Sequence, residues 1–149
     1  MRTAVTLLVC LLAAPLFAQQ QSDEEGRSSF CAVDIYMDSE GVPLAAYQLK
    51  FSITNVKAKI VGIEGGEHPA FREPPVYDPK AIQHERVIIA SFNTASGEQL
   101  PKGKTRLATI HVQTTGDDAL QCILKVQTAG NPEGKKIAVK ATWEERKNK

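Results

Sequence analysis

The side chains best suited to chemistry gather in one proline-rich segment, residues 64–83, which reads EGGEHPAFREPPVYDPKAIQ. Its acidic and imidazole groups are Glu64, Glu67, His68, Glu73 and Asp78. Oxygen ligands at this density are able to hold calcium, but the sequence lacks the D-x-D-x-D-G spacing of a calcium loop. The three histidines also lack the spacing of a zinc site. We therefore expect solvated charges here, with no metal and no cofactor, and calcium binding as the alternative.

No catalytic motif accompanies these groups. The sequence contains no G-x-S-x-G elbow, no H-E-x-x-H, no P-loop and no G-x-G-x-x-G. The carboxylate pair of a glycosidase is defined by its separation in space, which a sequence does not give. A domain of this size leaves little room for a substrate cleft, so we predict that the protein is not an enzyme.

The same segment is nevertheless the best candidate for binding. It is about 20 residues long, unusual for a connection inside a compact domain, and long loops on rigid scaffolds often carry function. Four prolines restrict its backbone, so it loses less entropy on binding than a flexible loop. The predicted contact residues are Glu67, His68, Phe71, Arg72, Tyr77 and Asp78. In the competing interpretation these side chains pack and seal one end of the domain.

The N-terminus predicts export. Residues 1–18, MRTAVTLLVCLLAAPLFA, have a basic start, an apolar run and a small residue at the cleavage position, as in a signal peptide. We expect a polar, disordered lead-in at 19–29, one domain at 30–144 and a polar tail at 145–149. The chain of 149 residues has 18 basic and 17 acidic residues, a balance that argues against nucleic-acid binding. No other run is long enough to span a membrane.

Two cysteines remain after such a cleavage, Cys31 and Cys122. Since exported proteins meet an oxidising environment, we predict a disulfide between them. The alternative is two separately buried thiols.

Period-two alternation indicates short strands throughout the chain. The predicted strands lie near 31–37, 44–53, 57–63, 86–92, 105–114, 120–128 and 136–141. Their inward-facing residues are predicted to be Val33, Ile35, Tyr47, Leu49, Phe51, Ile60, Ile88, Ala90, Ile110, Val112, Leu124 and Val139, and Phe92 is also expected to face the core. With no convincing amphipathic helix, this pattern predicts an all-β fold, an antiparallel β-sandwich.

Flat aromatic side chains would be needed to bind a polysaccharide on such a sandwich. Those not assigned to the core are Tyr36, Phe71, Tyr77 and Trp143. These four side chains either form a flat binding surface for a polysaccharide or pack within the domain.

The order of the segments resembles a cohesin domain. The carrying motifs are AAYQLKF at 45–51, the strand 59–66 that ends in a glycine turn, and GKTRLATIHV at 103–112. The resemblance covers residues 31–143. It implies a nine-stranded jelly roll, related to family-2 and family-3 carbohydrate-binding modules, and a dockerin held on one sheet face. The chain departs from the family in having Phe51-Ser52-Ile53 where Tyr-Asp-Pro is usual.

The expected function is therefore an exported, non-catalytic binding module, secreted or periplasmic, at a bacterial cell envelope. Its partner is expected to be a protein, dockerin-like or an envelope protein, or a polysaccharide. The alternatives are a carbohydrate-binding module proper and an accessory subunit of an envelope assembly. The sequence does not decide the oligomeric state.

Overall fold

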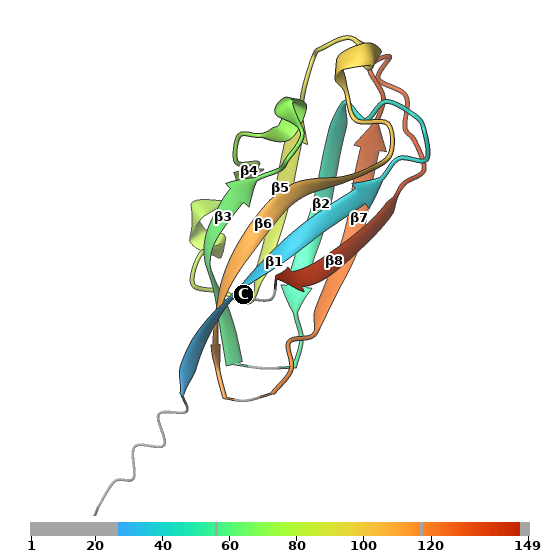
Figure 1. Ribbon diagram of the computed structural model, residues 1–149. Helices are drawn as coiled ribbons and strands as arrows, with labels where there is room; N and C mark the ends of the chain where they lie inside the picture. The colour runs from blue at the N-terminus through green and yellow to red at the C-terminus, as the bar shows by residue number, and fades with distance from the viewer. Residues whose placement is uncertain (1–26, 56, 117, 147–149) are drawn as a thin grey trace, which may run out of the picture.

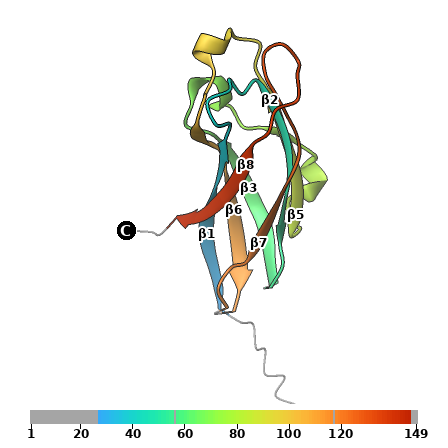
Figure 2. The ribbon, with the colours of Figure 1, turned by 90° about the vertical axis from the view of Figure 1, so that its right-hand side faces the viewer.

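Eight strands in two packed sheets form the domain, as the two layers in Figure 2 show. The computed structural model describes residues 27–55, 57–116 and 118–146. The predicted signal peptide, most of the lead-in and the last three residues lie outside the described residues. The strands are β1 (Ser28–Asp38), β2 (Ala46–Ile53), β3 (Lys57–Gly65), β4 (Val76–Tyr77), β5 (Arg86–Phe92), β6 (Lys104–Thr115), β7 (Cys122–Gly130) and β8 (Lys140–Arg146).

The two sheets each have four strands, and every neighbouring pair is antiparallel. Sheet A has the order β3-β6-β1-β8, and sheet B has the order β4-β5-β2-β7 (Figure 1). The all-β antiparallel sandwich predicted from alternation is confirmed, with eight strands rather than nine in the described residues. None of the helices in the described ranges has the length and apolar character needed to cross a membrane.

The strands extend beyond the predicted domain limits at both ends. Ser28 and Ser29, placed in the lead-in by the sequence, belong to β1, where the Ser29 and Thr114 hydroxyls are 2.7 Å apart. Glu145 and Arg146, placed in the tail, belong to β8. The last strand also begins later than expected, at Lys140, so residues 136–139 form part of the connection from β7.

The core lies between the sheets and follows the alternation in most strands. In β2, for example, Tyr47, Leu49, Phe51 and Ile53 are buried, and the residues between them are half-buried. The fully buried side chains of the two sheets include Val33, Ile35, Leu49, Phe51, Ile60, Ile89, Leu107 and Ile110. Leu124 and Val139 are only partly buried but pack against this cluster.

The predicted orientation of β5 is wrong. Val87 and Ile89 point into the core, whereas Ile88 is 44% exposed, Ala90 is only half-buried and Phe92 is 75% exposed. The run RVIIASF is apolar on both faces, so its periodicity does not say which face is inside. A change of one residue turns every side chain of a strand to the other side.

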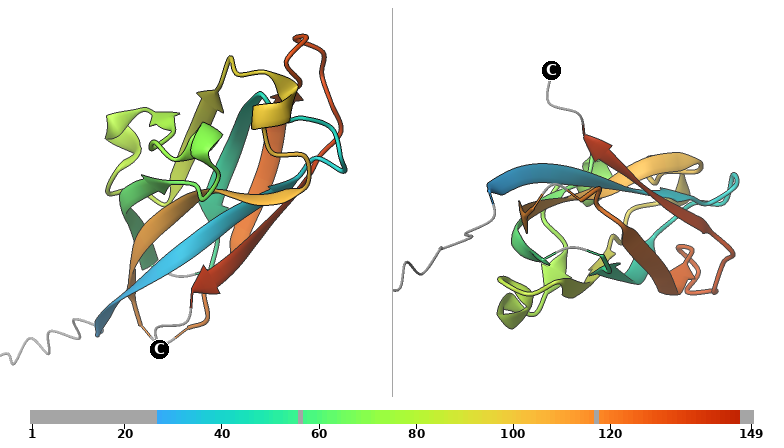
Figure 3. Two further views of the ribbon diagram at one scale, coloured as in Figure 1. Left: turned by 45° about the horizontal axis from the view of Figure 1, so that its top comes forward. Right: turned by 90° about the horizontal axis from the view of Figure 1, so that it is seen from below.

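The connection from β3 to β4 crosses from one edge of sheet A to one edge of sheet B and runs along one side of the sandwich (Figure 3). It contains the 3₁₀ turn η1 (Pro69–Phe71), and a second 3₁₀ turn, η2 (Pro79–Ala81), follows in the connection from β4 to β5. Two glycines allow the β3–β4 connection to pack closely. A Cβ on Gly65 would lie 1.8 Å from the Arg72 carbonyl oxygen, and one on Gly66 would lie 2.2 Å from the Arg106 carbonyl oxygen.

Candidate functional site

Glu67 and His68, two of the predicted contact residues, lie at the start of the β3–β4 connection. Both side chains accept hydrogen bonds from backbone N–H groups and so stabilise the conformation of this connection. The Glu67 carboxylate accepts a hydrogen bond from the Arg106 backbone N–H at 2.9 Å. The His68 Nδ1 atom accepts one from the Ala70 N–H at 3.2 Å and so caps η1. A neutral His68 therefore carries its proton on Nε2.

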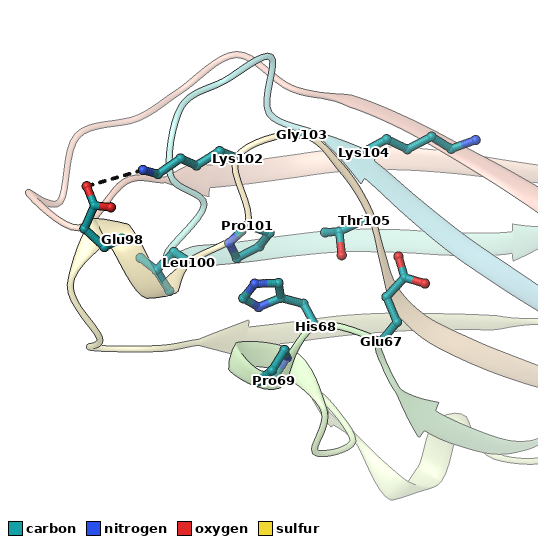
Figure 4. Close-up of a pocket in the computed structure, with 10 residues that line it drawn as sticks. All are labelled: Glu67, His68, Pro69, Glu98, Leu100, Pro101, Lys102, Gly103, Lys104 and Thr105. Atoms are coloured by element: carbon teal, nitrogen blue, oxygen red, sulfur yellow. Dashed lines mark ion pairs between the residues drawn. The ribbon is translucent and has the colours of Figure 1, made fainter.

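Both residues also line a cleft of about 530 Å³ between this connection and the segment that precedes β6 (Figure 4). The opposite wall consists of Glu98 and residues 100–105, and it carries an ion pair of 3.6 Å between Lys102 and Glu98. The cleft is open and mixed in polarity. Within the described ranges, no three His, Cys, Asp or Glu side chains are grouped so as to hold a metal ion.

Phe71 belongs to the interior. It is 1% exposed, and its ring meets the Tyr47 ring edge to face with centroids 5.3 Å apart. The Asn93 side-chain amide donates to the neighbouring Ala70 carbonyl at 3.0 Å and holds this turn in place. For Phe71 the structure favours the packing interpretation over contact with a partner. Arg72, the next residue, is exposed.

Tyr77 and Asp78 lie farther along the chain, in β4 and at the start of the connection from β4 to β5. Tyr77 is half-buried in β4, opposite Ile89, and Asp78 accepts from the Lys80 backbone N–H at 3.0 Å to cap η2. Both line a second cleft, of about 600 Å³, together with Val76 and Ile88. The structure thus divides the six predicted residues between two clefts, the core and an exposed position, and does not bring them into one site.

The second cleft opens onto the outer face of sheet B, along which several apolar side chains are exposed. These side chains, with their exposed fractions, are Val76 (75%), Ile88 (44%), Phe92 (75%) and Ile123 (55%). They come from β4, β5 and β7, all in this sheet. The sequence analysis missed this surface because it placed Ile88 and Phe92 inside. The available signal was RVIIASF itself, since a strand that is apolar on both faces has a second face to cover.

Cations accompany these apolar side chains. Lys50 of β2 lies directly opposite Ile88 of β5 on one side and Lys125 of β7 on the other. Arg86 begins β5 on the same face, opposite Ser52. Outward positions of β2, β5 and β7 carry no carboxylate among the described residues.

The outer face of sheet A has a different character. Asp34, 8% exposed, accepts hydrogen bonds from the Thr109 hydroxyl at 2.6 Å and from Arg146 Nη2 at 2.5 Å. Burial alone would raise the pKa of Asp34, but these hydrogen bonds and the guanidinium charges of Arg146 and Arg106 lower it below its ordinary value. The Asp34 carboxylate is thus partnered within the domain.

Other charged side chains on this face are also paired. Lys104 lies 2.9 Å from Glu144, and its ammonium group is 4.5 Å from the centre of the Tyr36 ring. The hydrogen bond that the Lys104 ammonium donates to Glu144 raises the pKa of Lys104. His111 Nε2 lies 3.0 Å from a Glu64 oxygen. This Nε2 atom is buried and makes no hydrogen bond among the described residues.

The two cysteines are free thiols in this structure and come from different sheets. Both are half-buried and pack against the core. Burial raises the pKa of Cys122 to about 12, with further contributions from Cys31 and Glu145, and burial followed by Glu145 raises that of Cys31. Their pairing stays a prediction.

Among solved structures, the chain is similar to type I cohesins. The seventh ScaB type I cohesin from Pseudobacteroides cellulosolvens matches with a TM-score of 0.53 at 10% identity over 76% of each chain. The Coh-OlpA-Doc918 cohesin–dockerin complex from Clostridium thermocellum matches with a TM-score of 0.49 at 11% identity, over 76% of this chain and 82% of that chain. No protein-family model and no curated protein sequence matches. The fold is cohesin-like, as the order of the sequence motifs predicted.

Proposed function

We propose that the domain is a non-catalytic protein-binding module and that the outer face of sheet B is its docking surface. The observation that carries this proposal is the group of exposed apolar side chains on that face, Val76, Ile88, Phe92 and Ile123. Apolar side chains gathered on one surface of a soluble domain mark interaction sites, because water is an unfavourable neighbour for them.

The cohesin-like fold supports the choice of a protein as partner. The resemblance to cohesins implies a dockerin-like segment held on one sheet face. Of the two outer faces, that of sheet B exposes the larger number of apolar side chains. Sheet A exposes Phe30 (65%), and most of the charged groups described on it are paired inside the domain. A dockerin-like or envelope protein is therefore the partner that we propose.

A polysaccharide is the less favoured ligand because the candidate aromatic side chains have other contacts. Phe71 is buried against Tyr47, and the Trp143 indole N–H donates to the Cys122 carbonyl at 3.1 Å. Tyr36 lies against Lys104, and Tyr77 packs against the core. None of the four presents the free, flat ring that a glycan platform needs.

We further propose that the module acts outside the cytoplasm, at the bacterial envelope. The signal-peptide pattern of residues 1–18 supports this proposal. The test is expression of the full chain in a bacterium, followed by fractionation and by mass determination of the mature N-terminus. Recovery of the uncleaved chain from the cytoplasm contradicts an exported location.

The docking proposal is tested with partners captured from the native secretome and with a panel of purified dockerins, both measured by calorimetry. The variants Ile88→Asp and Phe92→Asp are expected to lose the partner, because each places a charge in the apolar surface. Thr142→Asp, exposed on β8 of sheet A, is the matched control and is expected to bind normally. Equal binding by all three variants contradicts the proposed surface, and a partner found only on a glycan array contradicts a protein ligand.

A further inference from the structure

The charges on the outer face of sheet B all have the same sign along its three longer strands. Lys50, Arg86 and Lys125 point outward from β2, β5 and β7, and no carboxylate of the described residues forms an ion pair with any of them. The nearest acidic groups, Asp78 and Glu85, lie in the connection that leads to β5, beyond the strands.

Strand register places these cations close together. Lys50 and Lys125 are direct neighbours across the β2–β7 pair, and Arg86 is diagonal to Lys50 across the β2–β5 pair. Side chains directly opposite have Cβ atoms about 4.5–5.5 Å apart, and diagonal neighbours lie about 7–8 Å apart. Like charges directly opposite destabilise a sheet. The isolated domain therefore carries an unfavourable arrangement that an acidic partner would relieve.

The cations alternate with apolar side chains. Ile88 lies opposite Lys50, and Ile123 lies opposite Ser52, two residues before Lys125. We call the group Lys50, Arg86, Ile88, Ile123 and Lys125 the basic–apolar patch. A hydrophilic polyanion would neutralise its charges but leave the isoleucines in water. A polypeptide with interspersed acidic and apolar side chains satisfies both.

From this we infer that the partner of the domain presents an acidic, amphipathic polypeptide surface, and that Lys50, Lys125 and Arg86 select it by charge. The inference rests on the proposed docking function of sheet B and specifies its ligand. The cations raise the rate of encounter with an acidic partner and disfavour basic ones, while the isoleucines contribute apolar burial. The affinity should accordingly fall as ionic strength rises.

The test uses three synthetic helical peptides with one common leucine stripe, flanked by glutamate, glutamine or lysine. Binding is measured by calorimetry at low and at physiological salt. We expect the glutamate peptide to bind most tightly, and the Lys50→Glu/Lys125→Glu variant to weaken it by about tenfold or more and to gain affinity for the lysine peptide. The matched control is Lys57→Glu/Lys59→Glu on β3 of sheet A, which is expected to leave the affinities unchanged.

The other outcomes separate this inference from the docking proposal. Equal binding of all three peptides, lost with Ile88→Asp, overturns selection by charge and leaves the docking surface in place. Binding of none of them at millimolar concentration also overturns the inference, while the capture and dockerin experiment decides the docking surface independently. Binding of polygalacturonate instead, lost on reversing the two lysines, replaces the acidic polypeptide with an anionic polysaccharide. Circular dichroism of each variant verifies that it is folded.

Discussion

The side chains on the two outer faces of this sandwich differ in how many partners they have within the domain. On sheet A, Asp34 is surrounded by Thr109, Arg146 and Arg106, and Lys104 is paired with Glu144. On sheet B, isoleucine, valine and phenylalanine side chains stand in water beside cations that form no ion pair among the described residues. Most of the charges described on the first face are paired within the chain, although Phe30 is 65% exposed there and Lys57 and Lys59 form no ion pair among the described residues. On our proposal, a partner completes the second face by supplying apolar contacts and negative charge.

This difference shows that the exposure of side chains does not by itself identify the face that binds a partner. Several charged side chains on sheet A, among them Asp34, Lys104 and Arg146, already have partners, so a binding protein would have to replace these interactions at a cost in desolvation. On sheet B, covering the apolar groups releases water and competes with fewer existing interactions. The four predictions below test this contrast in order of decreasing expected effect.

The largest expected effect comes from joining the two sheets covalently. Oxidation of Cys31 and Cys122 to a disulfide closes a loop of about 92 residues and is expected to stabilise the domain by about 4–5 kcal/mol in the chain-entropy model. Urea unfolding with and without reductant measures this difference, and thiol titration of the denatured protein counts the free cysteines. The Cys31→Ser/Cys122→Ser variant is the control. Two titratable thiols in protein purified from an oxidising compartment contradict the pairing.

Phe71→Ala tests whether the β3–β4 connection belongs to the core or to the docking surface. Truncating a fully buried phenylalanine is expected to cost about 3–5 kcal/mol, because the transfer energy is lost and a cavity remains next to Tyr47. Thermal and urea unfolding measure the loss. Arg72→Ala, one residue away and exposed, should change stability by less than about 0.5 kcal/mol. If Phe71→Ala melts normally but loses the partner, the residue belongs to the docking surface.

Asp34→Asn removes the carboxylate at the centre of the hydrogen-bond network on the outer face of sheet A. It leaves two guanidiniums and a hydroxyl without their carboxylate, and we expect a loss of about 1–3 kcal/mol at neutral pH, discounted because Arg146 is partly exposed. Since the pKa of Asp34 is lowered on folding, its stabilisation is present above the ordinary aspartate pKa of about 3.9 and is lost as the pH falls through the lower folded value. Unfolding curves between neutral and acidic pH should show this acid-dependent component in the parent and not in Asp34→Asn. An identical acid dependence in both proteins argues against the network.

The smallest expected effect is a gain, rather than a loss, in the stability of the free domain. Lys125→Gln removes one member of the like-charge pair on sheet B and is expected to stabilise the free domain by a few tenths of a kcal/mol, while weakening its binding to an acidic partner. Lys140→Gln is the control in which stability should fall slightly, because Lys140 is paired with Glu40. A loss of stability in Lys125→Gln would indicate that Lys125 already has a favourable contact in the free domain.

The orientation of strands was predictable where polar and apolar residues alternate strictly. In β2, Tyr47, Leu49 and Phe51 alternate with polar side chains, so only one face of the strand could be turned toward the core. The structure confirms that orientation. In β5 both faces are apolar, so the sequence alone offered two arrangements of similar plausibility. The choice depends on contacts with β2 and β4, which lie far away along the chain.

The candidate site was harder to predict because several residues of the β3–β4 and β4–β5 connections bind the backbone of their own segment. His68-Pro69 and Asp78-Pro79 both place a capping side chain directly before a proline, which is the local signature of a short helical turn. That signal was present in the sequence and identifies two of the six residues as structural. The burial of Phe71 against Tyr47 and the close approach of Gly65 to the Arg72 carbonyl depend on the folded arrangement, and no local pattern reveals them.

The short strand β4 has a consequence for solubility. A protein with an exposed apolar sheet face risks joining its neighbours edge to edge into growing aggregates. At one edge of sheet B, β4 is only two residues long, preceded by Pro74 and Pro75 and followed closely by Pro79, which have no N–H to donate. That edge therefore offers few backbone hydrogen-bonding groups with which a strand of a neighbouring chain could pair. The domain is thereby able to keep its face open for a partner at high local concentration without recruiting copies of itself through that edge.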